Sequence, residues 1–189
     1  MKMKEIEVKA RISNISVIKS TFEQMGCIFS DPIIQRDKIF LRNNFSKSDC
    51  ALRIRKENDR ILFTMKIAQS NELDNIEKEL EISDAKEMED IIKLIGYKEF
   101  VRVNKTRIKC KYNKYEICLD DVECLGAFIE VEKILEEPLP GESISSQDAE
   151  IVQKELFDFL LEFGVKKEDR IWIGYDTMMY HKLNSVTSG

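Results

Sequence analysis

The sequence predicts an α+β protein built on an antiparallel sheet of about eight strands, strongly curved or closed, with three or four helices. The first observation behind this prediction is a series of short segments in which apolar and charged residues alternate, as in strands with one buried face. The second is that short polar links join most of these segments, which favours antiparallel neighbours. The third is that other segments carry apolar residues at helical spacing and end at a glycine.

The first half of the chain begins with an alternating strand at residues 5–12, EIEVKARI. A helix is predicted next by apolar residues at helical spacing: Ile15, Ile18, Phe22 and Met25. Ser13 or Asn14 is its expected N-cap, and Gly26 is its left-handed stop. Further strands of this half are expected at residues 33–41, 51–57, 60–68 and 76–83.

The second half repeats this plan with a helix that starts after Asp84 and ends at Gly96. Its apolar residues are Met88, Ile91, Ile92 and Ile95. Three strands follow, at residues 101–112, 115–122 and 127–135, and EEPLPGES at residues 136–143 is the clearest break in the chain. Beyond it, a third amphipathic helix ending at Gly164 is predicted by Val152, Leu156, Phe159, Leu160 and Phe163.

A faint internal repeat favours one domain made of two related halves. The strand from Glu5 with its helix and Gly26 resembles the strand from Glu77 with its helix and Gly96. We therefore assign residues 1–183 to a single domain and expect residues 184–189 to form a disordered tail.

The composition restricts the chemistry. With 189 residues, 43% hydrophobic, and no apolar run long enough for a membrane span or signal peptide, a cytoplasmic protein without a membrane partner is expected. The net charge of −5 argues against a generally basic surface for nucleic acid. The five cysteines form no C-x-x-C pair, so reduced structural thiols are expected, and the sole histidine, His181, is expected to be solvated near a polar tail. Any catalysis must therefore use carboxylates, lysines and arginines.

Charged residues recur two apart on strand after strand, so each pair shares one face. These sets are Glu5 with Glu7 and Lys9, Arg53 with Arg55, Glu77 with Glu79 and Glu81, Lys105 with Arg107, and Glu130 with Glu132. One interpretation is a sheet with one solvated face, which is the ordinary case. The other is a closed sheet whose charged face lines a tunnel, where basic groups would hold a polyanion and carboxylates would hold a divalent cation.

The motifs resemble those of the CYTH superfamily, which groups class IV adenylate cyclases with thiamine triphosphatases and related triphosphate tunnel enzymes. Glu5, Glu7 and Lys9 form its E-x-E-x-K signature. Later segments keep the order of the family: ALRIR, LFTMK, the acidic alternation at Glu77 to Glu81, VNKTRIKCKY, CLDDVECLGAFIEVE and EDRIWIGYDTMM. The resemblance covers essentially the whole chain and is greatest to class IV adenylate cyclases.

This resemblance implies an eight-stranded antiparallel barrel that forms a tunnel, with helices packed outside. It implies triphosphate contacts from Lys9, Arg53, Arg55, Lys66, Lys105 and Arg107. It implies that Mg2+ or Mn2+ is held by Glu7, Asp120 and Glu130, in line with the preference of these ions for oxygen ligands. Glu5, Glu132 and Lys66 are the catalytic candidates, with Glu5 and Glu132 as candidate bases; Glu79 and Glu81 are further tunnel candidates, whereas Asp121 and Glu123 belong to the turn or outer face.

Three functions follow as alternatives. In the first, a cyclase converts ATP to cyclic AMP and pyrophosphate, and the family resemblance implies a homodimer. In the second, a triphosphatase hydrolyses thiamine triphosphate, inorganic tripolyphosphate or a nucleoside triphosphate. In the third, the protein is a non-catalytic module that binds nucleotide or polyphosphate.

Overall fold

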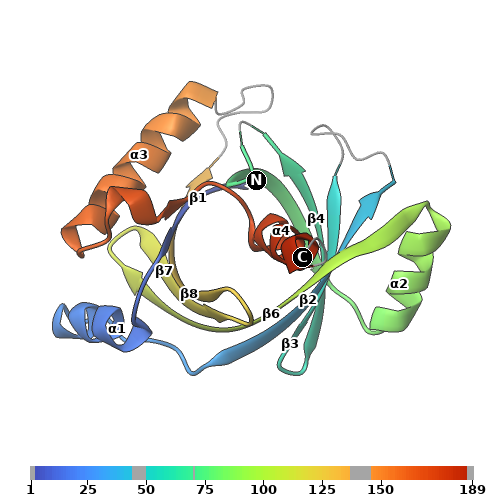
Figure 1. Ribbon diagram of the computed structural model, residues 1–189, viewed down its shortest axis with the longest axis horizontal. Coiled ribbons are helices and arrows are strands. Elements are labelled where there is room, and N and C mark those ends of the chain that lie inside the picture. The colour runs from blue at the N-terminus through green and yellow to red at the C-terminus, as the bar shows by residue number, and fades with distance from the viewer. Residues whose placement is uncertain (1–2, 44–49, 70, 137–145, 187–189) are drawn as a thin grey trace.

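A closed antiparallel barrel forms the body of the protein (Figure 1). The computed structural model describes residues 3–43, 50–69, 71–136 and 146–186. The barrel strands are β1 (Met3–Arg11), β2 (Ile33–Arg42), β3 (Ala51–Glu57), β4 (Arg60–Ala68), β5 (Asp74–Glu81), β6 (Tyr97–Tyr112), β7 (Tyr115–Val122) and β8 (Gly126–Glu136). Their order is β5-β4-β3-β2-β6-β7-β8-β1, and pairing of β1 with β5 closes the sheet. The predicted eight-stranded antiparallel barrel is confirmed.

The seam between β1 and β5 is short and is supported by helix α3 (Ser146–Glu162). The ladder spans two residue pairs, beside a hydrogen bond from the Glu7 amide to the Leu73 carbonyl at 3.2 Å. The buried side-chain amide of Gln153 donates to the carbonyl oxygens of Glu7 and Leu73 at 3.3 and 3.4 Å. Because a buried carbonyl without a partner costs free energy, α3 helps to close the barrel at the strand that carries Glu7.

Helices α1 (Ile15–Gln24) and α2 (Ala85–Leu94) follow β1 and β5, so the predicted repeat is present (Figure 1). Asn14 and Asp84 are their N-caps, and each side chain accepts hydrogen bonds from backbone amides of the first turn. Gly26 and Gly96 follow the two helices with φ angles of +86° and +92°, in the left-handed region that glycine adopts without strain. The predicted start and stop signals of both helices are confirmed.

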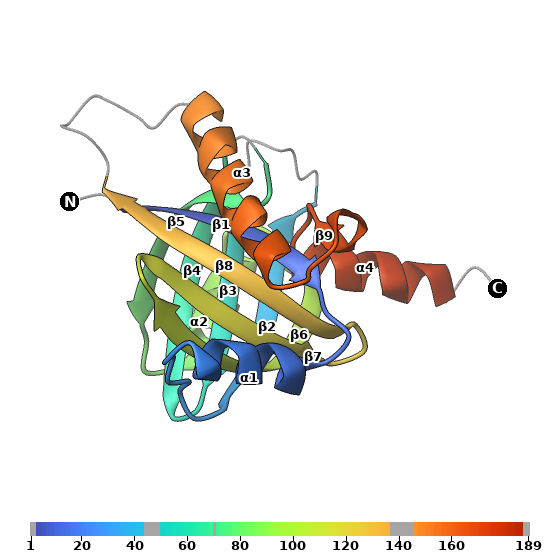
Figure 2. The ribbon, with the colours of Figure 1, turned by 90° about the vertical axis from the view of Figure 1, so that its left-hand side faces the viewer.

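The main core lies between the barrel and the helices on its outer surface (Figure 2). Ile6 and Val8 of β1 are fully buried against Phe22 of α1 and Leu156 of α3. A separate apolar cluster around Ile92 packs α2 on the barrel. Because successive side chains of a strand point to opposite faces, this arrangement directs the charged face of β1 into the interior.

The C-terminal helix α4 (Tyr175–Val186) is absent from the sequence-based prediction. It follows a short 3-10 helix, η1 (Lys167–Asp169), and strand β9 (Arg170–Ile171), which pairs with β1. Figure 2 shows that α4 starts at one end of the barrel and projects away from it. Its buried Tyr175 and Met179 pack in an apolar cluster with Phe128 of β8.

Most other expectations agree with the structure. Strands β3, β4 and β7 have the predicted bounds, whereas β6 begins at Tyr97 instead of at residue 101. Residues 184–186, expected to belong to a disordered tail, are helical, and residues 187–189 lie outside the described part. Of the predicted break at residues 136–143, residues 137–143 lie outside the described part of the chain. All five cysteines are free, as predicted.

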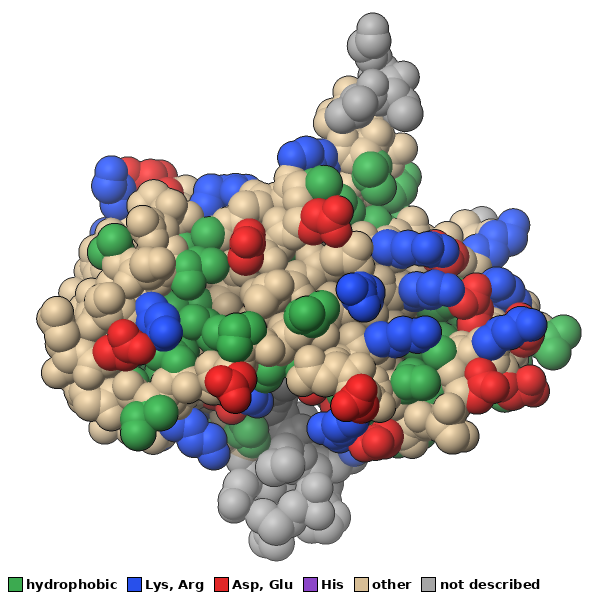
Figure 3. Space-filling view, turned by 90° about the horizontal axis from the view of Figure 1, so that it is seen from below, with side chains coloured by type: hydrophobic (Ala, Val, Ile, Leu, Met, Phe, Trp, Pro, Cys, Tyr) green, Lys and Arg blue, Asp and Glu red, His purple; other side chains and the backbone are tan. Residues whose placement is uncertain are grey.

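The outer surface in Figure 3 carries acidic and basic side chains next to one another. Outward-facing ion pairs in the protein include Lys38 with Glu89 at 2.5 Å and Arg102 with Glu99 at 2.6 Å. Among the described helices, none is both long and apolar enough to cross a membrane. The visible outer face is thus an ordinary mixed-charge surface, and the unusual charge pattern lies inside the barrel.

Gln153→Leu is expected to destabilise the protein by about 1–3 kcal/mol, because two carbonyls of the seam lose a donor in a buried place. Urea unfolding followed by circular dichroism measures the effect. Lys154→Ala is the matched control, because the neighbouring side chain is 77% exposed and its removal should change stability by no more than about 0.5 kcal/mol. Equal stability of the two variants would contradict a role of Gln153 in closing the barrel.

Candidate functional site

The charged strand faces line a cavity inside the barrel, with a volume of about 1080 Å³. The pairs predicted to share a face, such as Glu130 with Glu132 and Arg53 with Arg55, lie on its wall. Glu130 and Lys9 are only 3% and 2% exposed, so the solvated-face interpretation is wrong for them. Among the described residues that line the cavity, carboxylates outnumber Lys and Arg side chains by ten to eight.

Three carboxylates converge on one wall of the cavity. The antiparallel pairing of β1 with β8 sets Glu7 opposite Glu132 and Lys9 opposite Glu130. Carboxylate oxygens of Glu7, Glu130 and Glu132 consequently lie within 4.8 Å of one another. Burial raises the pKa of Glu7 above its ordinary value, against the lowering effect of Lys9. This all-oxygen donor set fits a hard divalent cation such as Mg2+ or Mn2+.

Glu130 also joins this wall to the basic residues. Its carboxylate pairs with Lys9 at 2.9 Å and closely with Arg107. Burial alone would raise its pKa, but Arg107 and Lys9 hold the pKa of Glu130 well below its usual range. Glu130 is therefore ionised at neutral pH and stabilises two buried cations.

Asp120 lies beneath the cavity wall in a cluster with Lys105, Arg107 and Tyr175. Arg107 donates to both of its oxygens at 2.7 and 2.6 Å, Lys105 donates at 2.9 Å, and the Tyr175 hydroxyl donates at 3.0 Å. The carboxylate is fully buried and does not line the cavity. Asp120 thus orients the cations that do line it.

Tyr175 connects this cluster to α4. Its ring lies 4.1 Å from the Lys9 ammonium and 4.9 Å from that of Lys105, which places both cations against an aromatic face. Burial raises the pKa of the Tyr175 phenol well above its ordinary value, so the hydroxyl remains a donor to Asp120. Burial and the nearby Arg107 lower the pKa of Lys105 despite its contact with Asp120.

A second basic wall comes from β3 and β4. Arg53 contacts Glu79 at 3.3 Å and Thr64 at 3.1 Å, while Lys66 pairs with Glu77. The Nε atom of Arg53 is buried and has no hydrogen-bond partner in the described structure. The hydrogen-bonding capacity of this guanidinium is therefore less completely used than that of Arg107, and its side chain, 14% exposed, lines the cavity.

Arg55 is neutralised by a partner that the sequence-based site did not include. Its Nε and Nη2 atoms donate to the two oxygens of Asp37 at 2.7 Å each, and both side chains are buried. Burial alone would raise the pKa of Asp37, yet Arg55 lowers it to about 2. The pair forms a fixed part of the barrel interior.

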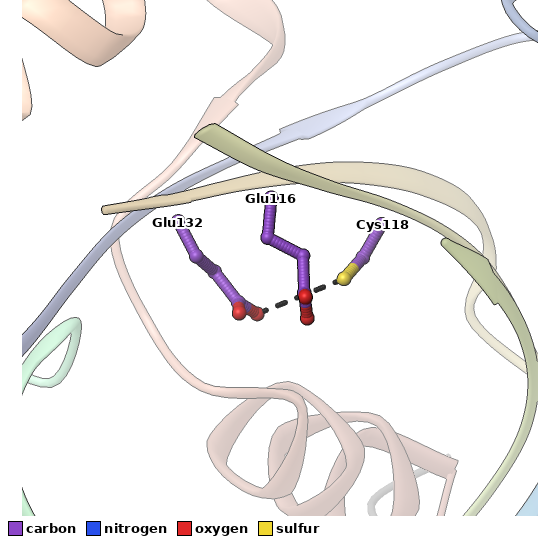
Figure 4. Close-up of side chains that lie close together, drawn as sticks. All are labelled: Glu116, Cys118 and Glu132. Carbon is purple, nitrogen blue, oxygen red and sulfur yellow. Dashed lines mark hydrogen bonds between the residues drawn. The ribbon is translucent and has the colours of Figure 1, made fainter. Parts of the chain in front are cut away.

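Cys118 stands beside the carboxylate wall (Figure 4). Its thiol donates to Glu132 at 3.8 Å, and Glu116 lies within the same group of potential ligand atoms. Burial raises the pKa of the Cys118 thiol well above its ordinary value, so it stays protonated at neutral pH. Together with Arg107, 3.5 Å from the same oxygen, it orients the Glu132 carboxylate.

Most of the residues predicted for the site line the cavity: Glu7, Lys9, Arg53, Arg55, Lys66, Glu79, Lys105, Arg107, Glu130 and Glu132. Three do not join them. Asp120 lies beneath the wall, Glu81 pairs with Arg60 where both side chains are more than half exposed, and the side chain of Glu5 is outside the described structure. Asp121 and Glu123 belong to the outer face and turn, where Asn104 donates to Glu123 at 2.8 Å.

Several functional candidates were missed from the sequence. Asp37 lies two residues from both Gln35 and Ile39 in β2, so the three share one face of the strand. This spacing in the sequence could have identified Asp37 as an interior residue. Tyr175 depends on α4, which was not predicted. His181, expected to be solvated near a polar tail, is exposed, and it also lines the cavity.

Comparison with known proteins gives one family and several similar chains. A model of the CYTH domain matches residues 3–171. A protein of Methanocaldococcus jannaschii named "Putative adenylate cyclase MJ0240" is 29% identical over 177 residues, which cover 92% of this chain and 97% of the relative.

Solved structures agree in fold. The PH1012 protein of Pyrococcus horikoshii OT3 is 28% identical and has a TM-score of 0.75, with 93% of this chain and 99% of the other covered. A structure from Vibrio parahaemolyticus described as a putative adenylate cyclase has a TM-score of 0.72 at 15% identity, with 94% and 98% covered. At that identity the likeness shows the fold alone.

Asp37→Asn is expected to cost about 3 kcal/mol of stability at neutral pH, because Arg55 loses the charge that compensates it in a buried place. The pKa of Asp37 is about 2 in the fold against an ordinary value of 3.8. Its ionised form therefore stabilises the fold above about pH 4, and this contribution, about 2 kcal/mol, is lost as the pH falls towards 2.

Urea unfolding of both proteins between pH 7 and pH 2.5 tests this expectation. The difference in free energy of unfolding between wild type and variant should shrink below pH 4. Asp59→Asn, at an exposed turn, is the control and should follow the wild type. A difference that stays constant over the whole pH range would show that the Asp37–Arg55 pair does not titrate with the fold.

Proposed function

Because the chain belongs to the CYTH domain family, we propose that it binds a nucleoside triphosphate, as its complex with Mg2+ or Mn2+, inside the barrel and converts ATP to cyclic AMP and pyrophosphate. The observation that carries this proposal is that one cavity combines a three-carboxylate wall, Glu7, Glu130 and Glu132, with a basic wall that includes Arg53 and Lys66. A metal-bound triphosphate needs both. The name of the relative from M. jannaschii, which refers to adenylate cyclase, supports the same reaction.

The cation would be held by Glu7 and Glu130, with Glu132 as the third carboxylate of the group. When bound, it supplies positive charge that neutralises the phosphates and polarises the reacting oxygen. The sequence-based set named Asp120 in place of Glu132. The contacts favour Glu132, because Asp120 is covered by Arg107, Lys105 and Tyr175.

The phosphate chain lies against the basic side chains. Arg53 lines the cavity with a side chain that is 14% exposed, and Lys66, whose side chain is 31% exposed, offers an ammonium accessible from the cavity. Lys9, Lys105 and Arg107 are held on the other side by buried carboxylates, so their positions are fixed before a substrate arrives. Preorganised charge of this kind is what phosphoryl transfer chiefly requires.

In the proposed reaction the ribose 3'-hydroxyl attacks the α-phosphorus. The bond from that phosphorus to the bridging oxygen of the β-phosphate breaks, and pyrophosphate leaves with the electron pair. Lys66 and Arg53 stabilise the charge on the departing group, and the hydroxyl proton passes to a water molecule. The homodimer implied by the family resemblance stays a prediction.

The decisive experiment is incubation with ATP, thiamine triphosphate or tripolyphosphate, with Mg2+ or Mn2+, followed by chromatography of the products. Cyclic AMP and pyrophosphate from ATP are expected. Formation of orthophosphate would instead identify a triphosphatase, in which water attacks the terminal phosphorus. Binding of ATP without any turnover would replace both with a non-catalytic nucleotide-binding module.

Lys66→Met and Arg53→Ala should each weaken binding of metal-bound ATP by about 1.5–3 kcal/mol, because each removes one charge-assisted contact. Isothermal titration calorimetry measures this loss. Lys78→Ala is the control, because Lys78 lies on the outer face of β5 between Glu77 and Glu79. Unchanged ATP affinity in both cavity variants would contradict a triphosphate site on this wall.

Glu7→Gln should reduce Mn2+ affinity in the presence of ATP by tenfold or more while the protein stays folded, because the ion pair that Glu7 makes with Lys9 is long, at 3.5 Å. Mn2+ binding followed by electron paramagnetic resonance provides the readout. Glu130→Gln should reduce Mn2+ affinity and also stability, since it removes the partner of two buried cations. Normal Mn2+ affinity in the Glu7→Gln variant would contradict a metal site formed by Glu7, Glu130 and Glu132.

A further inference from the structure

The mouth of the cavity next to α4 differs in chemistry from its interior. Phe100, Trp172, Tyr180 and His181 line the cavity; the last three are exposed, which places them at its opening, and Phe100 stacks on Tyr180. We call these four side chains the aromatic rim. Deeper in the cavity, the wall is dominated by the paired charges described above.

One face of α4 forms part of this rim. Thr177, Tyr180 and His181 are spaced as i, i+3 and i+4 and line the cavity. Tyr175 and Met179 pack against the inner faces of the barrel strands. The helix is therefore anchored through one set of side chains and presents a second set to the mouth.

The rim side chains are held in place yet accessible. The ring of Tyr180 stacks on Phe100 with centroids 4.5 Å apart, and Tyr180 is 42% exposed. The guanidinium of Arg170 lies 3.6 Å from the centroid of the Trp172 ring, and Trp172 remains 57% exposed. Exposed aromatic faces that are already fixed can stack on a planar ring with little loss of conformational freedom.

The start of α4 is fixed as well. Glu72, in the link between β4 and β5, accepts hydrogen bonds from the Gly174 amide at 2.8 Å and the Thr177 hydroxyl at 2.9 Å. This carboxylate is thereby engaged with the positive end of the helix. Asp176, which also lines the mouth, offers oxygens to a donor on a ligand.

The size of the cavity also exceeds what a phosphate chain needs. Its volume of about 1080 Å³ lies slightly above the usual range for clefts that hold a drug-sized molecule, about 300–1,000 Å³. A triphosphate held by Lys66 and Arg53 leaves the α4 side of the same cavity for the rest of the substrate.

We propose that the aromatic rim binds the planar heterocycle of the substrate, so that the protein acts on a triphosphate that carries a ring and not on inorganic tripolyphosphate. The proposal rests on the proposed function, because it takes the interior as the triphosphate site. The shared chemistry is a flat aromatic ring joined to the phosphate chain, as in a nucleoside triphosphate or thiamine triphosphate. Trp172 and Tyr180 are its specificity-determining residues.

The test compares two variants with three ligands. Tyr180→Ala and Trp172→Ala should each weaken binding of ATP or thiamine triphosphate, in Mg2+, by about tenfold, the effect of losing one ring stack. Binding of tripolyphosphate should change by less than about twofold, because it has no ring to stack. Tyr180→Phe should restore ATP affinity, and Leu183→Ala is the control on α4, since Leu183 is 56% exposed and does not line the cavity. The ring-bearing ligand that loses more identifies the heterocycle.

Two results would overturn the proposal while the proposed triphosphate site stands. One is unchanged ATP and thiamine triphosphate affinity in both rim variants. The other is an equal loss for tripolyphosphate, which would show that the substitutions act through the position of α4. If the wild-type protein binds none of the three ligands, the proposed function itself fails, because there is then no ligand affinity for Lys66→Met to reduce.

Discussion

The closed barrel forces charged side chains into an enclosed interior, and the rest of the structure depends on how those charges are compensated there. A buried ion without a partner costs several kcal/mol, so each one needs an opposite charge nearby. The chain meets this requirement through strand register. Pairing of β1 with β8 puts Lys9 beside Glu130, and pairing of β6 with β7 puts Arg107 beside Asp120. Compensation inside the barrel therefore follows from the hydrogen-bonded ladder that builds it.

This compensation is uneven, and the unevenness distinguishes structural from functional charges. Asp37 with Arg55 and Asp120 with Arg107 are bidentate pairs with little capacity left for a ligand. Arg53, by contrast, has a buried Nε donor without a partner among the described residues. On physical grounds, the strong pairs set the shape of the cavity, while the incompletely paired groups are the ones that the proposed function assigns to the substrate.

The strands were predictable because their signal is local. Alternation alone yields β3, β4 and β7 with their observed bounds, and the glycine and N-cap signals locate α1 and α2. Closure and the identity of the converging carboxylates were not predictable in this way. Whether Glu132 or Asp120 joins Glu7 and Glu130 depends on cross-strand register and on a covering tyrosine from a helix far along the chain. The helix α4 was missed although Tyr175, Met178 and Met179 recur at helical spacing. Its apolar face packs against the end of the closed barrel, and the periodicity of the sequence does not show that this surface exists.

The balance of charge in the cavity bears on the form in which a polyanion enters. With ten carboxylates and eight Lys or Arg side chains on the described wall, a bare triphosphate would meet a slightly acidic interior. Its phosphates would have to compete with Glu77 for Lys66 and with Glu79 for Arg53. A divalent cation that enters with the triphosphate changes this balance, because Glu7, Glu130 and Glu132 then face a positive charge instead of a negative one. Under the proposed function, the carboxylates that would repel the bare triphosphate would thus favour its metal complex, and the cation would contribute to recognition as well as to chemistry.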